Sequence, residues 1–282
     1  MIQLAPVLGL ARAEARLARR LVRYWVFVVI AAIVCAGQAS QFFFIHKMFS
    51  WVSASAASAN PRYFVGNFGA LFMLVFFIGL IFLSFDIRAR DKRERIHEVV
   101  DALPCSNLEF VLGRALGILI AAWVPLVVII GLLALVAWRP LHDPIEPWSL
   151  LSLTVPMAIP GYVFTIGLIF LLTLLVRHRL IAALVSFAAL ALLFVAGIWW
   201  MPFYASAFTD ITGGYAVGFP SDILPGVVTA LGSLQRIGYL VLGLGLLVLA
   251  AAIHPRRDDS RRGLVAAVGG GLLVAGLLLA GL

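Results

Sequence analysis

Residues 112–137 read LGRALGILIAAWVPLVVIIGLLALVA, a run of 26 residues in which Arg114 carries the single charge. A helix that crosses the hydrocarbon core of a bilayer needs about 20 predominantly apolar residues. This run is apolar on every face at helical spacing, as in a helix surrounded by lipid or buried in a bundle. It therefore predicts a membrane-spanning helix.

The composition of the whole chain agrees with that prediction. The 282 residues are 63% apolar and 12% charged, and the mean hydropathy is +1.08. Soluble domains carry about 25% charged residues, so we expect an integral membrane protein. The net charge of +8 is typical of basic loops near anionic lipid. Nucleic acid is not expected as a partner, and Cys35 and Cys105 are expected to be unpaired thiols without a metal.

Seven apolar runs predict the spans of an all-α polytopic membrane protein. The runs are 21–44, 68–85, 112–137, 150–176, 180–200, 237–253 and 264–282. We expect a six-span domain at 21–255 and an additional transmembrane helix at 264–282. The last run has 19 residues with three consecutive glycines, so two topologies stay open. If it crosses, the termini lie on opposite sides; if it does not, six spans leave both termini on one side.

Lysine and arginine predict the orientation. Seventeen of the 21 Lys and Arg residues are assigned to one side of the membrane. Five lie in the N-terminal segment, and six lie between the second and third runs or at the start of the third run. Two more follow the fourth run, and four follow the sixth. The other four, assigned to the opposite side, are Lys47, Arg62, Arg139 and Arg236. Basic residues concentrate in cytoplasmic loops. We therefore expect a multi-pass protein of the cell (inner) membrane with a cytoplasmic N-terminus.

Residues 1–20 are predicted to form an amphipathic helix at the membrane interface. Arginines recur at i, i+4, i+7 and i+11 and form a basic stripe, while leucines mark another face. The arginines are Arg12, Arg16, Arg19 and Arg23, and the leucines are Leu10, Leu17 and Leu21. The alternative is a solvated basic flank.

Residues 86–101 form an island of charge between two apolar runs. Ten of these sixteen positions are Asp, Glu, Lys or Arg, a density that hydrocarbon does not accept. Ile96, Val99, Val100 and Leu103 recur at i, i+3, i+4 and i+7, which predicts a short amphipathic helix. Pro104 is expected to end this helix.

A second helix is predicted directly after Pro104. Ser106-Asn107-Leu108-Glu109 has the spacing of a capping box, in which the Glu109 side chain accepts a hydrogen bond from the Ser106 amide. This helix continues into the third apolar run. The sequence therefore predicts a helix, a sharp corner and a second helix beside the membrane.

The sequence contains no recognisable catalytic or metal-binding pattern. Neither Lys47 nor Lys92, the two lysines, follows the Gly-rich run of a Walker A motif. Residues 97–101, HEVVD, resemble the zinc motif HExxH, but Asp101 replaces the second histidine. The apolar runs lack the ionisable groups that ion-coupled carriers need near the midplane. We expect no enzyme activity, no cofactor or metal in this chain, and no self-powered transport.

Residues 86–114, DIRARDKRERIHEVVDALPCSNLEFVLGR, resemble the first cytoplasmic loop of ABC-2 type transporter permeases. In that family a charged stretch, a short helix ending near Leu-Pro-x-Ser and a Leu-Gly-Arg/Lys entry into the third helix form the coupling element. The pattern of residues 1–255 is also similar, with an amphipathic N-terminal helix, six spans and a longer segment between the fifth and sixth. The loop is most similar to permeases that occur with, or are fused to, an aminopeptidase of the M1 type, although no peptidase motif occurs here.

The resemblance implies the permease subunit of an ABC transporter that exports an unknown substrate. Two permease subunits, identical or different, would pair in the lipid membrane, each with its loop 86–111 in a groove of a separate ATPase subunit that binds the ATP. The residues that would seat the coupling helix are Ile96, Val99, Val100, Leu103 and Pro104. The residues that would face the ATPase or the N-terminal helix are Arg90, Arg93, Glu94, His97, Glu98 and Asp101. The alternative is a membrane sensor or assembly protein whose loop binds a soluble partner without transport.

Overall fold

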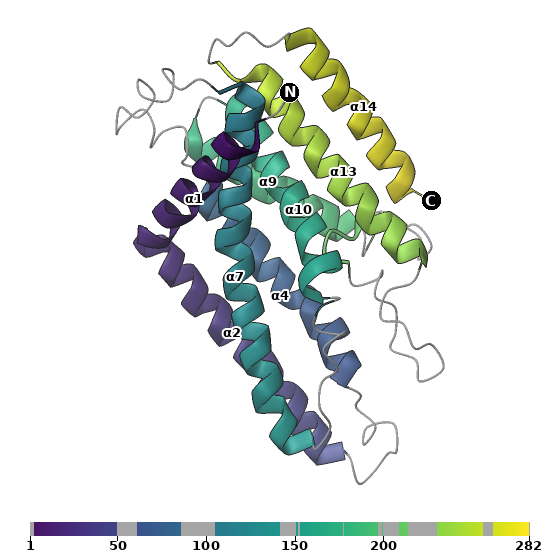
Figure 1. Ribbon diagram of the computed structural model, residues 1–282. Coiled ribbons are helices and arrows are strands. Elements are labelled where there is room, and N and C mark those ends of the chain that lie inside the picture. The colour runs from purple at the N-terminus through teal and green to yellow at the C-terminus, as the bar shows by residue number, and fades with distance from the viewer. Residues whose placement is uncertain are drawn as a thin grey trace.

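The computed structural model shows a bundle of helices (Figure 1). The described residues are 3–49, 61–85, 105–141, 151, 153–176, 178–196, 199, 209–213, 230–255 and 262–281. Within these residues the chain forms helices and short connections, and no strand occurs among them. The expected all-α architecture is therefore confirmed for the part of the chain that is described.

Each of the seven apolar runs coincides with helix. A further helix, α1 (Leu4–Arg20), precedes them and is separated from α2 by a break at Leu21. The helices of the runs are α2 (Val22–Phe49), α4 (Pro61–Ser84), α7 (Asn107–Leu141), η1 with α9 (Leu153–Met157 and Ala158–Leu175), α10 (Arg179–Val195), α13 (Ala230–Ile253) and α14 (Arg262–Ala280).

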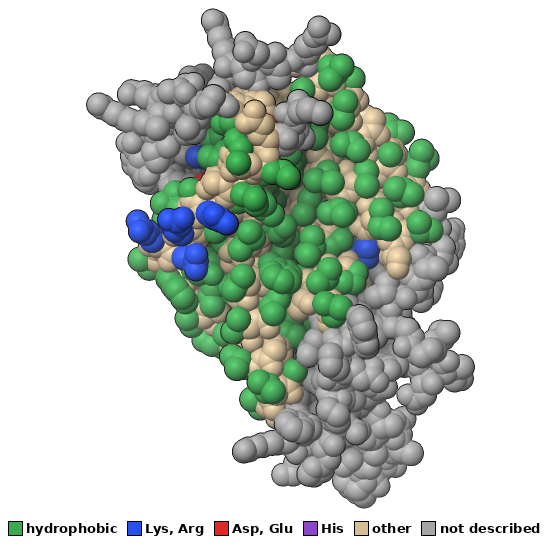
Figure 2. All heavy atoms as spheres, viewed as in Figure 1, with side chains coloured by type: hydrophobic (Ala, Val, Ile, Leu, Met, Phe, Trp, Pro, Cys, Tyr) green, Lys and Arg blue, Asp and Glu red, His purple; other side chains and the backbone are tan. Residues whose placement is uncertain are grey.

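Five helices among the described residues are long and apolar enough to cross a membrane. They are the segments Val22–Gln41, Asn107–Val136, Leu153–Leu175, Gly232–Ile253 and Arg262–Ala280. Two further apolar helical stretches are shorter within the described part of the chain: Met73–Ser84, which is part of α4, and Arg179–Val195, which is α10. Large apolar side chains also cover the outside of the bundle, as Figure 2 shows. These features indicate a multi-pass membrane protein.

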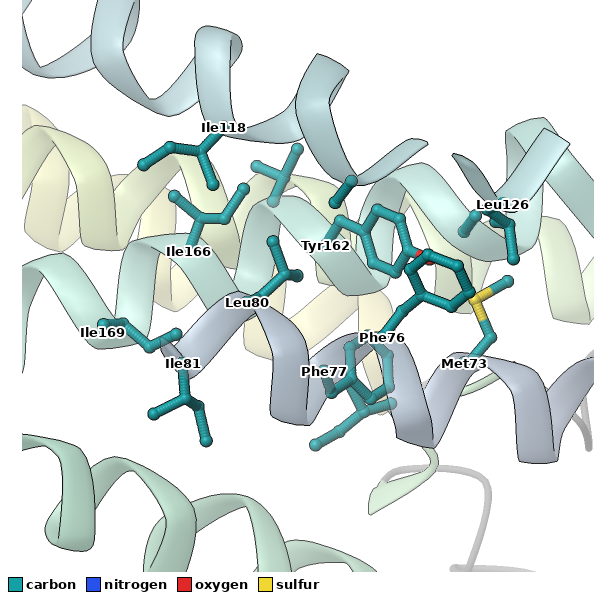
Figure 3. Close-up of a cluster of buried hydrophobic side chains, with 14 of the residues drawn as sticks. Met73, Phe76, Phe77, Leu80, Ile81, Ile118, Leu126, Tyr162, Ile166 and Ile169 are labelled. Atoms are coloured by element: carbon teal, nitrogen blue, oxygen red, sulfur yellow. The ribbon is translucent and has the colours of Figure 1, made fainter. Parts of the chain in front are cut away.

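The core lies where α4, α7 and α9 meet (Figure 3). Met73, Phe76 and Leu80 from α4 are fully buried. The Tyr162 ring of α9 lies between the aromatic rings of α4, with centroid distances of 6.1 Å to Phe76 and 5.8 Å to Phe77. The large side chains are therefore concentrated between these three helices, each of which packs against the other two.

Glycine brings α13 against its two neighbours. A Cβ atom at Gly243 of α13 would lie 2.5 Å from the Phe164 nitrogen of α9. A Cβ atom at Gly238 would lie 2.6 Å from the Ala280 nitrogen of α14. Small residues allow this close approach of backbones, which is how helices pack when lipid surrounds them. In Figure 1, α14 accordingly lies alongside α13 at the edge of the bundle.

Helix α7 is longer than the membrane is thick. Its 35 residues rise by about 1.5 Å each and extend over about 52 Å, whereas the hydrocarbon core measures about 30 Å. About 20 Å of the helix therefore lies in the headgroup layers or in water. The end that begins at Asn107 carries the charged side chains Glu109 and Arg114, and there α1 packs against it.

Candidate functional site at the start of helix α7

The residues predicted to make up the coupling helix lie outside the described residues. They are Arg90, Arg93, Glu94, Ile96, His97, Glu98, Val99, Val100, Asp101, Leu103 and Pro104. The chain is described on both sides of this loop, up to Phe85 and again from Cys105. The contacts of these two flanks with the N-terminal segment define the candidate site.

The predicted capping box is present at the start of α7. The Ser106 amide donates a hydrogen bond to Glu109 Oε2 at 2.8 Å, and the Glu109 amide donates one to Ser106 Oγ at 3.2 Å. The two bonds satisfy amide groups that the first turn of a helix leaves without a partner. They fix the direction in which the chain enters α7 from the charged loop.

The same Glu109 carboxylate also binds the N-terminal segment. The Gln3 amide, directly before α1, donates a hydrogen bond to Glu109 Oε1 at 2.6 Å. The side chain of Glu109 is buried, with 5% of the residue exposed. One carboxylate thus accepts hydrogen bonds from the amides of Gln3 and Ser106, two backbone segments that lie far apart in the chain.

Helix α1 packs closely along the first turns of α7. Its buried face carries small side chains, including Ala11 and Ala15. A Cβ atom at Gly113 of α7 would lie 2.9 Å from the Val7 carbonyl oxygen, and one at Gly117 would lie 2.7 Å from the Ala11 carbonyl oxygen. The backbones of the two helices are therefore in direct contact. We call this contact, from Gln3 to Ala18 and from Ser106 to Ala121, the α1–α7 junction.

A buried ion pair crosses the junction. Arg114 Nε of α7 lies 3.7 Å from Glu14 Oε2 of α1, and both side chains are almost fully buried. The Arg114 guanidinium also lies over the Phe110 ring, 4.5 Å from its centroid. The Phe110 ring in turn contacts the His254 ring just after α13, at 5.4 Å between centroids. These contacts connect α1, α7 and the end of α13.

The other flank of the charged loop contacts the start of α2. The Arg23 guanidinium lies over the Phe85 ring, 5.6 Å from its centroid, and Phe85 directly follows α4. The next residue, Tyr24, donates a hydrogen bond from its hydroxyl to the Ala121 carbonyl of α7 at 3.1 Å. The break between α1 and α2 is thereby fixed to both α4 and α7.

Some of these residues had a signal in the sequence and others did not. Glu14 is the only acidic residue among the first 85, and at helical spacing it falls on the face opposite the basic stripe. Arg114 is the single charge in its apolar run. A charge alone among apolar residues indicates a buried partner, and the two are partners here. Gln3 acts through its backbone amide, which no side-chain pattern can reveal.

The expectation that the spans contain no buried charge is wrong for α7, where Arg114 is buried, and for α13. Arg236, predicted to lie in a loop before the sixth span, lies inside α13 and is 2% exposed. Its guanidinium donates hydrogen bonds to the Ile211 carbonyl at 3.0 Å and to the Asp210 carbonyl, and it lies over the Tyr239 ring. Buried arginine is tolerated because these acceptors replace water.

The segment that accepts these hydrogen bonds is a turn built by Asp210. One Asp210 carboxylate oxygen accepts hydrogen bonds from the amides of Thr212 and Gly213 at 3.0 and 3.1 Å. Gly213 has a φ of 81°, a left-handed conformation that glycine adopts without strain. The turn and Arg236 therefore form a second polar cluster, which satisfies backbone groups inside an apolar bundle.

Among the described residues, no group of three or more His, Cys, Asp and Glu side chains could hold a metal ion. In these clusters Glu109 and Arg236 bind backbone groups, and Arg114 pairs with Glu14. The geometry of the α1–α7 junction is that of a mechanical connection between helices. Comparison of the chain with known protein families and with curated proteins finds no match.

Proposed function

We propose that this chain is the permease subunit of an ABC-2 type transporter, which exports an unknown substrate with energy from a separate ATPase subunit. The observation that carries the proposal is that residues near the N-terminus, between Gln3 and Arg23, contact both flanks of the charged loop. Phe85 contacts Arg23 on one side, and the Ser106–Glu109 box binds Gln3 on the other.

A loop held in this way is suited to transmit force. If a partner pushes residues 86–104, the displacement reaches α4 through Phe85 and α7 through the capping box. Helix α7 is continuous from Asn107 to Leu141, so a movement at its start extends across the membrane. A loop that only recruited a soluble protein would not need rigid attachment at both ends.

The division of roles follows from the resemblance of the loop to the permease family. The apolar stripe of Ile96, Val99, Val100 and Leu103 would seat the coupling helix, with the ATPase on its charged side. Because the chain has no Walker A motif, the ATP would lie on the partner subunit. A second permease subunit would complete the transporter.

The proposed topology places the α1–α7 junction on the cytoplasmic side. The excess of Lys and Arg in the N-terminal segment and in the charged loop favours this orientation. Helices α2, α4, α7, α9, α10 and α13 would then be the six spans of the permease domain, and α14 an additional crossing.

The test begins with the partner. The full-length chain is purified from native membranes under mild conditions, and the bound proteins are identified by mass spectrometry. We expect a soluble subunit with a Walker A motif in stoichiometric amount, and ATPase activity in the complex. Without an ATPase partner the proposal fails, and a different soluble partner would favour the sensor or assembly protein.

The loop is then tested within the complex. Glu94→Arg combined with Leu103→Asp reverses one charge and breaks the apolar stripe, so we expect loss of the partner or of its stimulated ATPase activity. Arg139→Glu, near the far end of α7, is the matched control and should leave both unchanged. ATPase activity and complex formation that survive the loop variant would refute the coupling role.

A further inference from the structure

The exposed face of α1 is strongly basic. The face opposite the junction carries four exposed arginines within nine residues, whereas Ala11, Ala15 and Ala18 of the same helix are buried against α7. The four are Arg12, Arg16, Arg19 and Arg20. Arg19 Nε donates a hydrogen bond to the Ala15 carbonyl at 3.3 Å, and the residue is exposed. Like charges at i, i+4 repel each other along a helix, so this face destabilises α1 unless an anion covers it.

The basic face borders an apolar surface. Directly after the break at Leu21, Val22 and Trp25 are 78% and 56% exposed, and Val26 and Val29 continue the exposed apolar face of α2. The Trp25 indole donates a hydrogen bond to the Arg19 carbonyl at 2.9 Å, which fixes it at the boundary. Figure 2 shows the group of basic side chains immediately beside the apolar surface.

We propose that Arg12, Arg16, Arg19 and Arg20 form a docking surface for the headgroups of anionic phospholipids, and that lipid bound there holds α1 against α7. Guanidinium groups bind phosphate oxygens in a bidentate manner. A basic face at the edge of an apolar surface lies at the depth of lipid phosphates, with tryptophan at the same level. Arg23 is excluded from the surface because it lies over Phe85.

This position selects lipid over other anionic occupants. A soluble anion or an acidic protein would need no apolar surface beside the arginines, whereas a phospholipid places its chains there. Lipid that neutralises the four charges removes their mutual repulsion and favours the docked helix. Anionic lipid would therefore stabilise the contact between Gln3 and Glu109, and the lipid composition would regulate the junction.

The first experiment measures lipid selectivity. The full-length protein is reconstituted in a 1:1 mixture of phosphatidylglycerol and phosphatidylcholine and extracted, and the retained lipids are quantified by mass spectrometry. Each arginine near an anionic surface contributes about a fivefold preference. We expect Arg12→Gln with Arg16→Gln to lower the preference for phosphatidylglycerol at least about fivefold, and high salt to lower it in the wild type.

Two variants decide whether the effect belongs to this surface. Arg179→Gln with Arg262→Gln removes two exposed charges at the starts of α10 and α14 and should have a clearly smaller effect. Lysine at all four α1 positions keeps the charge and should keep most of the selectivity. If the two double glutamine variants lose equal selectivity, the attraction is diffuse and the docking surface is refuted. The unreacted thiol of buried Cys35 verifies that each variant is folded.

The second experiment measures the junction itself. In the wild type, phosphatidylglycerol should slow hydrogen exchange of the α1 amides relative to phosphatidylcholine alone, and in the Arg12/Arg16 variant it should not. Exchange that is independent of lipid in the wild type would overturn the regulatory part of the proposal. Neither experiment contains an ATPase, so a negative result in either would not refute the permease proposal. Conversely, if the chain has no ATPase partner, the proposal of a lipid docking surface still stands.

Discussion

Substitution of Gly117 by alanine tests whether α1 is docked on α7 as described. A Cβ atom at this position would lie 2.7 Å from the Ala11 carbonyl oxygen and 2.7 Å from Glu14 Cβ. Ordinary contacts begin at 3.4 Å, so α1 must move outward by about 0.7 Å along this turn. Both contacted atoms belong to the helix backbone or directly adjoin it, so a rotamer change cannot relieve the clash.

Gly131 provides the matched control because it lies in the same helix and a Cβ atom there would contact nothing within 4 Å. Alanine at either position gains about 1 kcal/mol of helix propensity. Only Gly117→Ala adds overpacking, which costs about 1–3 kcal/mol. The difference between the two variants therefore isolates the steric cost at the junction.

The assay is hydrogen exchange of the α1 amides in lipid nanodiscs. If the cost falls on docking, the open population of α1 should rise about 5- to 150-fold in Gly117→Ala relative to Gly131→Ala. Thiol labelling of Cys35 should stay slow in both, because Cys35 is a fully buried residue of α2, whereas the atoms that an added Cβ at Gly117 would meet all belong to α1. Equal exchange of α1 in the two variants would refute the close packing of α1 on Gly117.

Three further predictions concern the polar contacts and the turn at Gly213. Glu109→Gln should leave the amide of either Gln3 or Ser106 without an acceptor, which costs about 1–3 kcal/mol. Faster hydrogen exchange at one of these two amides measures the loss, and unchanged exchange at both would contradict the two bonds. Arg236→Met keeps much of the apolar volume but leaves the carbonyls of Asp210 and Ile211 unpaired, so unfolding in SDS should become easier by about 2–4 kcal/mol. Gly213→Ala should destabilise by about 1 kcal/mol or more in the same assay, because of its positive φ. Wild-type stability of Arg236→Met would contradict the described contacts of Arg236, and wild-type stability of Gly213→Ala would contradict the left-handed conformation of the turn.

The helices of the bundle were predictable because lipid makes hydrophobicity a sufficient signal. A backbone that crosses hydrocarbon must satisfy its own hydrogen bonds, so each long apolar run forms a helix whatever its neighbours are. The start of α7 was predictable for a second reason. The capping box is a local pattern, and Ser106 and Glu109 carry it within four residues.

The start of α13 was not predictable by the same rule. Arg236 interrupts the apolar pattern, which moved the expected start of the span to residue 237, whereas the helix begins at Ala230. The charge is stable inside the bundle because the turn at Asp210, some 25 residues earlier in the chain, presents its carbonyls there. A hydropathy value describes how well a single residue is accommodated in lipid. It contains no information about a hydrogen-bond acceptor that a distant part of the chain supplies.

The junction shows most clearly what local patterns omit. A capping box accepts Glu or Gln at its fourth position, because one side-chain oxygen is enough to bind the amide of the first residue. In this structure both oxygens of Glu109 accept backbone amides, one from Ser106 and one from Gln3. A glutamine would present a donor to one of those amides, so only the carboxylate can serve both. The acidic side chain at position 109 is therefore explained by the connection to α1, and the helix cap alone would not require it.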